Sequence, residues 1–172
     1  MTIRPIIELP DPSLREVSKP VAEITDETRT LIADMFETMY DAEGIGLAAV
    51  QIGVMQRLFV TDIARDEESP QQLVFINPEI VWSSEAGEEY EEGCLSIPEQ
   101  KGLVTRPSEV KIKFLDREGA SQEMHCTGLL AICVQHELDH LNGVLFIDYL
   151  SRLKRERITK KFAKARRLEG TS

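Results

Sequence analysis

Two histidines four residues apart, with a glutamate between them, are the most chemically specific feature of this 172-residue sequence. His136, Glu137 and His140 lie in a stretch that is predicted to be helical. Residues four apart in a helix project from one face, so the two imidazoles can bind a single metal ion. Glu137 can then take a proton from a water molecule beside the metal. The spacing predicts a metal-dependent hydrolase.

The residues around this motif favour a metal site over two ordinary histidines. Most of them are apolar: Leu129, Leu130, Ala131, Ile132, Cys133, Val134, Leu138 and Leu141. A helix that is apolar on nearly every side is expected to be buried. Buried histidine and carboxylate groups are costly unless a partner satisfies them, and a metal ion would do so.

A catalytic metal needs a third protein ligand, and the sequence after His140 offers no suitable one. Some metallopeptidases place a third histidine six residues further on, but that position is Phe146 here. The later acidic residues Glu156 and Glu169 lie in a strongly basic segment. We therefore expect the third ligand upstream of the helix.

Cys94 is the upstream residue that we expect to complete the ligand set. Cys133 shares the helix face, but it lies about 10 Å from His140 along the axis. Because metal–ligand bonds are only about 2.0–2.3 Å long, one ion cannot be bound by both residues. Cys133 is therefore expected to line a pocket. His125 and Cys126 are farther still and have no assigned role. The glycine before Cys94 permits a close backbone approach, and thiolate is a strong soft ligand.

The elements that must position these residues follow from hydrophobic periodicity. Helices are predicted over residues 25–44, 127–142 and 152–168, and strands over 57–63, 73–82, 109–116 and 121–126. Residues 1–20 are expected to form an extended or irregular arm, and the glutamates of 85–92 a solvated surface. This order indicates an α+β fold with antiparallel or mixed sheets around a central buried metal-binding helix. We expect one domain, made of a catalytic body (1–150) and a basic C-terminal helix (151–172).

Charge and composition exclude several classes of protein. The formal net charge is −10, yet residues 151–172 hold nine basic and two acidic residues, leaving eleven basic and twenty-eight acidic residues for the body. No apolar run approaches the roughly 18 residues of a membrane span. The N-terminus lacks the apolar stretch of a signal peptide, and three cysteines are too few for a disulfide scaffold. We expect a cytoplasmic protein with reduced thiols and no membrane contact.

Three motifs together resemble the peptide deformylase family, whose members remove the N-formyl group from nascent chains. They are Gly44-Ile45-Gly46-Leu47-Ala48-Ala49-Val50-Gln51, Glu92-Gly93-Cys94-Leu95-Ser96 and Gln135-His136-Glu137-Leu138-Asp139-His140. The resemblance implies one ferrous ion, bound by Cys94, His136 and His140. Ligand types alone also suit zinc, nickel or cobalt, which are expected to substitute.

The same resemblance implies how the reaction is catalysed. Glu137 would act as general base and then as general acid. The side-chain amide of Gln51 and the backbone N–H of Leu95 would stabilise the oxyanion of the tetrahedral intermediate. Formate would be the second product.

Substrate recognition also follows from the resemblance, which implies that the N-formylmethionyl peptide binds like an extra strand. We expect its backbone to be held by Ile45, Gly46 and Gly93. An apolar slot for the methionine side chain would be lined by Leu129, Ile132 and Cys133, with His136. For Leu129 and Ile132 the alternative is plain core packing.

Two carboxylates near these motifs are expected to make supporting contacts. Glu92, beside the cysteine motif, is expected to contact the substrate or a metal ligand. Asp139 points away from the histidine face, and Arg106 is the candidate for its partner.

Two other functions stay open on the residues alone. A zinc-dependent peptidase would share the metal helix but would need a downstream ligand. A non-enzymatic factor could dock on ribosomal RNA through the basic residues 151–172, and a deformylase could use the same helix to stay near its nascent substrates. We expect a monomer that does not bind DNA.

Overall fold

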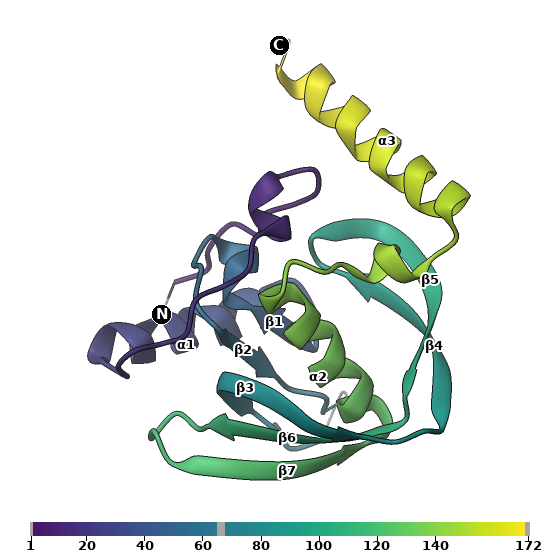
Figure 1. Ribbon diagram of the computed structural model, residues 1–172. Coiled ribbons are helices and arrows are strands. Elements are labelled where there is room, and N and C mark those ends of the chain that lie inside the picture. Colours follow the sequence, from purple (N-terminus) through teal and green to yellow (C-terminus); the bar gives the residue numbers. More distant parts are fainter. Residues whose placement is uncertain (1, 65–67, 171–172) are drawn as a thin grey trace.

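The chain folds as an α+β protein in which a helix lies between two antiparallel sheets (Figure 1). This computed structural model describes residues 2–64 and 68–170. Five strands form one sheet in the order β1-β2-β3-β6-β7, and β4 and β5 form a separate hairpin. The helix α2 contacts strands of both sheets. The fold class expected from the sequence is confirmed.

The elements have the following bounds. The helices are α1 (Asp26–Asp41), α2 (Gly128–Leu141) and α3 (Arg152–Gly170), with short 3-10 helices η1 (Pro12–Arg15), η2 (Ala49–Ile52) and η3 (Phe146–Tyr149). The strands are β1 (Gly46–Ala48), β2 (Leu58–Thr61), β3 (Leu73–Ser83), β4 (Gly87–Cys94), β5 (Ile97–Pro107), β6 (Glu109–Leu115) and β7 (Ser121–Thr127).

Strand β6 illustrates how the sequence builds the five-stranded sheet. Its side chains alternate between polar and apolar, and Val110, Ile112 and Phe114 are buried while the lysines between them are exposed. A period of two directs alternate side chains to opposite faces, so one face of the strand packs against α2. Ala131 and Val134 of α2 belong to the same apolar cluster. The four predicted strands are all present.

The helix α1 begins where predicted and ends three residues before Gly44. At its start the Thr25 hydroxyl accepts a hydrogen bond from the backbone N–H of Thr28. At its end Glu43 adopts a left-handed conformation, with φ of 58°. The N–H of Gly44 then bonds to the carbonyl of Met39, which is a Schellman termination.

The hairpin β4–β5 was not predicted, because its glutamates, apart from Glu92, were interpreted as solvated surface. Those glutamates are indeed exposed, whereas Glu92 is buried. The buried side of β5 includes Gly102, Val104 and Arg106. Because a glycine and a charged residue occupy two of these buried positions, β5 lacks the alternation of apolar and polar side chains by which strands are recognised.

The helix α2 starts immediately after β7. Thr127 is its N-cap residue, as expected, but its side chain makes no capping hydrogen bond. Gly143 follows the helix with φ of +74°, and a Cβ at this position would lie 2.3 Å from the carbonyl oxygen of Arg15. Only glycine fits there, so the end of α2 lies directly against the N-terminal arm.

The N-terminal arm is fastened to the body along its length. The backbone N–H of Ile7 donates to the carbonyl of Gln51 at 2.7 Å, and that of Leu9 donates to the carbonyl of Ser96 at 2.9 Å. The arm also contains η1, a short helix that the sequence did not predict.

The helix α3 projects from the body and is drawn in yellow-green in Figure 1. Ile158 is buried and Phe162 partly buried, and both pack in one cluster with Leu9 and Leu14 of the arm. Most of its basic side chains are exposed. None of the helices in the described part of the chain is long and apolar enough to cross a membrane.

Candidate functional site

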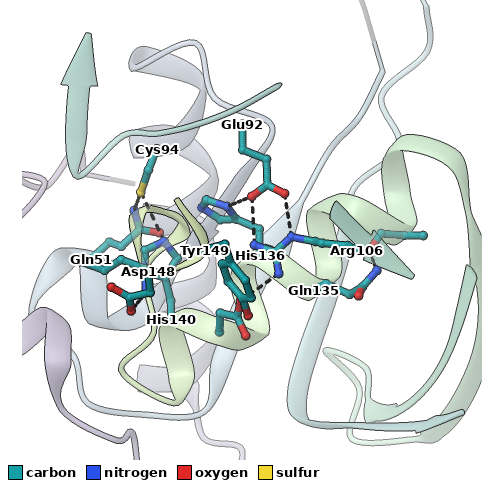
Figure 2. A network of polar contacts seen from close by, with 12 residues as sticks. Gln51, Glu92, Cys94, Arg106, Gln135, His136, His140, Asp148 and Tyr149 are labelled. Atoms are coloured by element: carbon teal, nitrogen blue, oxygen red, sulfur yellow. Dashed lines mark hydrogen bonds and ion pairs between the residues drawn. The ribbon is translucent and has the colours of Figure 1, made fainter. Parts of the chain in front are cut away.

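Three residues from two elements meet at the centre of the molecule. Cys94 ends β4, and His136 and His140 occupy successive turns of α2. One donor atom from each lies within 4.8 Å of the other two, and Cys94 Sγ is 3.3 Å from His140 Nε2. The predicted ligand set is therefore assembled in space, with the thiol approaching the helix from the hairpin (Figure 2).

The donor atoms suit a divalent transition metal. A thiolate with two imidazoles is a set that binds iron, zinc, cobalt or nickel. Burial lowers the pKa of His140 well below its usual range, which keeps its imidazole neutral, as a metal ligand must be. Three protein ligands leave a coordination position for a reactant, which is the arrangement of catalytic rather than structural sites.

A second layer of polar residues fixes His136 (Figure 2). Its Nδ1 lies 2.9 Å from Glu92 Oε1, so Nε2 is the nitrogen left for a metal. Burial alone would raise the pKa of Glu92, but hydrogen bonds from His136 and Arg106 outweigh it and lower the pKa. The carboxylate therefore stays ionised, and the expected contact between Glu92 and a metal ligand is present.

Arg106 connects this layer to the rest of the fold. Its guanidinium donates two hydrogen bonds to Glu92, at 2.6 and 2.9 Å, and one to Asp139 at 2.8 Å. The expected pairing of Asp139 with Arg106 is confirmed. The Tyr149 hydroxyl also donates to Asp139 at 2.7 Å, and the Arg106 guanidinium lies 4.8 Å from the Tyr149 ring centroid. Tyr149 carried no signal in the sequence, because nothing local relates it to residue 139.

Glu137 points into the site from the helix that carries both histidines. Burial raises its pKa to about 7, the usual range for a general base or acid working near neutrality. Its Oε1 is buried and bonds to none of the described residues. A Cβ on Gly46 would lie 2.6 Å from Glu137 Oε2, so the glycine of β1 makes room for this carboxylate.

Gln51 lies next to the thiol of Cys94. Its side chain is almost completely buried, and its Nε2 is 3.7 Å from Cys94 Sγ. Leu95 follows Cys94 at the turn of the hairpin and, like Gln51, lines the cavity beside the ligands. The structure therefore brings both predicted oxyanion donors to the metal-ligand cluster.

A cavity of about 530 Å³ opens onto this cluster. Its wall includes every residue predicted to bind substrate: Ile45, Gly46, Glu92, Gly93, Leu129, Ile132 and Cys133. Leu129, Ile132 and Cys133 form an apolar portion on α2, beside His136 and Glu137. Beyond Glu92 and Gly93, the sequence missed other hairpin residues in the wall: Tyr90, Ile97, Pro98, Glu99, Gln100 and Lys101.

The two residues without an assigned role lie elsewhere. Cys126 is fully buried within the apolar cluster between the sheet and α2. His125 is half exposed, with its Nε2 2.9 Å from Glu109 on the neighbouring strand. Neither belongs to the metal-ligand cluster.

Comparisons with known proteins agree with this geometry. A family model described as polypeptide deformylase matches residues 3–156. The peptide deformylase of Rhizobium meliloti (strain 1021) is 56% identical over 170 residues, covering 99% of this chain and 98% of that protein. A crystal structure of a peptide deformylase from Legionella pneumophila has a TM-score of 0.89 and 50% identity, with 99% of both chains covered. The peptide deformylase from Ehrlichia chaffeensis in complex with actinonin has a TM-score of 0.91 and 38% identity, over 96% of this chain and 98% of that chain.

Proposed function

The chain belongs to the polypeptide deformylase family and is an enzyme that removes the N-formyl group from nascent polypeptides; we propose that it does so with a divalent metal ion held by Cys94, His136 and His140. The observation that carries this assignment is the meeting of three metal-donor atoms within 4.8 Å beside a cavity. When bound, the metal would polarise the formyl carbonyl and lower the pKa of the attacking water.

Glu137 is the proton carrier in this proposal. Its buried carboxylate, with a pKa near 7, accepts a proton from the attacking water. It then gives that proton to the departing amine, so that formate and a free N-terminus are released. The gap left by Gly46 lets the carboxylate face the reacting group.

Gln51 and Leu95 are the proposed donors to the oxyanion. The Gln51 Nε2–H and the Leu95 backbone N–H would stabilise the negative charge that develops on the formyl oxygen. Their position beside Cys94 supports this role.

The apolar part of the cavity is the proposed slot for the methionine side chain. Leu129, Ile132 and Cys133 would line it. Ile45, Gly46 and Gly93 would hold the peptide backbone like an added strand. Replacing Ile132 with Phe should raise the KM for formyl-methionyl peptides more than it changes kcat. An unchanged KM would count against the slot.

We propose iron as the native metal, following the resemblance of the three motifs. The test is formate release from a formyl-methionyl peptide under anaerobic conditions, with metal analysis of the same sample. One ferrous ion per active chain, and loss of activity in air, is the expected result. Full activity with zinc alone in the freshly isolated enzyme would contradict it.

The comparisons do not favour the zinc-peptidase alternative, and Cys94 separates the two functions experimentally. Replacing Cys94 with Ser should abolish iron-supported deformylation, because a hydroxyl is a much weaker ligand than a thiolate. A peptidase that takes its third ligand from elsewhere would keep its activity.

We propose that the basic helix α3 holds the enzyme near the ribosome. We also propose that the protein is a cytoplasmic monomer whose catalytic body comprises residues 1–150. Deleting α3 is a poor test, because Ile158 and Phe162 pack against the N-terminal arm. Replacing the exposed Lys160, Lys161 and Lys164 with Gln keeps that packing.

These replacements should weaken co-sedimentation with ribosomes at low salt without altering turnover of a free peptide. The matched control replaces three exposed lysines of the body: Lys19, Lys111 and Lys113. Equal loss in both triple variants would contradict a specific role of α3. Light scattering tests the monomer, and fractionation of cells tests the cytoplasmic location.

A further inference from the structure

Ser96 is a buried residue beside the active site to which the mechanism above gives no role. It follows Leu95 at the turn between β4 and β5, and it has no solvent exposure. Its Oγ accepts a hydrogen bond of 3.0 Å from Gln51 Nε2. This is the shortest contact of the amide nitrogen that the described residues provide.

The amide of Gln51 is fixed at both ends. Its Oε1 accepts a hydrogen bond of 2.9 Å from the backbone N–H of Ala48, while its Nε2 donates to Ser96. Rotating the amide by 180° would set the NH2 group against the Ala48 N–H, leaving two donors face to face. The orientation with Nε2 toward the hairpin is therefore strongly preferred.

This orientation determines where the second N–H of the amide points. One hydrogen on Nε2 is taken by Ser96, and the other is directed to the side of Cys94, whose Sγ is 3.7 Å away (Figure 2). Without the Ser96 hydroxyl, the amide would lose the hydrogen bond that holds one of its N–H groups, and the direction of the other N–H would no longer be fixed. Oxyanion donors are effective because they are already aimed before charge develops.

The backbones of both residues are held by one further segment. The carbonyls of Gln51 and Ser96 accept hydrogen bonds from Ile7 and Leu9 of the N-terminal arm, at 2.7 and 2.9 Å. The arm therefore keeps η2, which carries Gln51, and the turn that carries Ser96 at a fixed separation.

We propose that Ser96 is a positioning residue for deformylation, whose hydroxyl aims the Gln51 amide at the formyl oxygen. This inference rests on the proposed role of Gln51 as an oxyanion donor. It assigns Ser96 an effect on the transition state that is exerted only through Gln51.

A double-mutant cycle tests the proposal. Replacing Gln51 with Ala should lower kcat by about 10²–10³-fold, as expected for one oxyanion donor. Replacing Ser96 with Ala should lower kcat by about tenfold and leave KM within twofold. In the Gln51→Ala background the Ser96→Ala change should have no further effect on kcat, because the residue that it positions is gone.

The outcomes separate the proposal from the role on which it rests. If Gln51→Ala leaves kcat unchanged, Gln51 is not a donor and both ideas fail. If Gln51→Ala lowers kcat but the two effects multiply, Gln51 keeps its role and the positioning role of Ser96 is overturned.

Two further measurements exclude a merely structural effect. Ser18→Ala is the matched control, because Ser18 is also buried but its Oγ bonds to none of the described residues; it should leave kcat unchanged. The absorption spectrum of the cobalt-substituted Ser96→Ala enzyme should match that of the parent. A shifted thiolate band would mean that Ser96 acts on Cys94 instead, which would overturn the proposal.

Discussion

At the scale of single residues, the active site depends on a missing side chain. Gly46 leaves the space that the Glu137 carboxylate occupies, and a Cβ there would also lie 2.9 Å from Cys133 Sγ. Both contacts are with buried side-chain ends on α2, so a Cβ at residue 46 would force the Glu137 carboxylate and the Cys133 thiol to shift.

Replacing Gly46 with Ala should therefore displace the general base. General acid–base catalysis contributes about 10²–10⁴-fold, so we expect kcat to fall by about 10² while the protein stays folded. Steady-state kinetics and circular dichroism measure the two effects. Gly87→Ala, on exposed backbone at the start of β4, is the control and should keep full activity. A Gly46→Ala enzyme with parental kcat would show that the carboxylate has room to move.

The pH dependence of Glu137 provides a second test at this scale. A base must be ionised to act, so activity should be lost as pH falls through its pKa. Burial places that pKa at about 7 in the metal-free protein, and a bound divalent cation should lower it by favouring the carboxylate. The infrared band of the protonated carboxyl, compared between the parent and Glu137→Gln, should titrate near pH 7 without metal and at lower pH with it. Identical titrations in both states would contradict a carboxylate close to the metal.

At the scale of elements, the site is a junction between the hairpin and α2. Arg106 on β5 joins Glu92 on β4 to Asp139 on α2, and it is 4% exposed. Removing one member of a buried ion pair leaves the other charge without a partner, which typically costs about 3–5 kcal/mol.

Replacing Arg106 with Met should therefore destabilise the protein by about 3–5 kcal/mol and weaken metal retention, since Glu92 also orients His136. Urea denaturation and metal content after dialysis against a chelator measure these effects. Arg152→Met is the control, because Arg152 is 84% exposed in its pair with Glu156 and should contribute less than about 1 kcal/mol. Equal destabilisation in the two variants would argue against the junction.

The elements also show which parts of the structure the sequence could predict. His136, Glu137 and His140 were predictable because a helical spacing of four is a local pattern, and β6 because its alternation is local too. The hairpin was missed because Gly102 and Arg106 interrupt its apolar face. The hydrogen bonds of Ser96 to Gln51 and of Tyr149 to Asp139 were missed because these partners are 45 and 10 residues apart, and no local pattern records such contacts.

At the scale of the whole molecule, the fold should lose stability in acid. Arg4 of the N-terminal arm pairs with Asp34 of α1 at 2.7 Å, and the Asp34 side chain is nearly buried. Burial would raise the pKa of Asp34, but hydrogen bonds from Arg4 and the Thr2 backbone lower it below its usual value. A lowered folded-state pKa stabilises the protein above the unfolded pKa of about 3.9, and this contribution disappears as pH falls further.

Replacing Asp34 with Asn should lower the Tm by a constant amount between pH 7 and pH 5, since the carboxylate is ionised throughout that range. The difference from the parent should shrink below about pH 4, where Asp34 becomes protonated in the unfolded parent, and should shrink further as pH falls through the lower pKa of the folded state. Differential scanning calorimetry at several pH values measures this. Asp26→Asn removes an ion pair between the fully exposed Asp26 and the half-exposed Arg29, and it should change the Tm little at any pH.

The packing of α3 on the N-terminal arm has a consequence for how the enzyme is synthesised. Leu9 and Leu14 are translated long before their partners Ile158 and Phe162. The arm that holds the carbonyls of Gln51 and Ser96 therefore gains its contacts with α3 only after α3 has been translated. An enzyme that acts on other chains during their translation thus cannot complete the support of its own active site until α3 has been made.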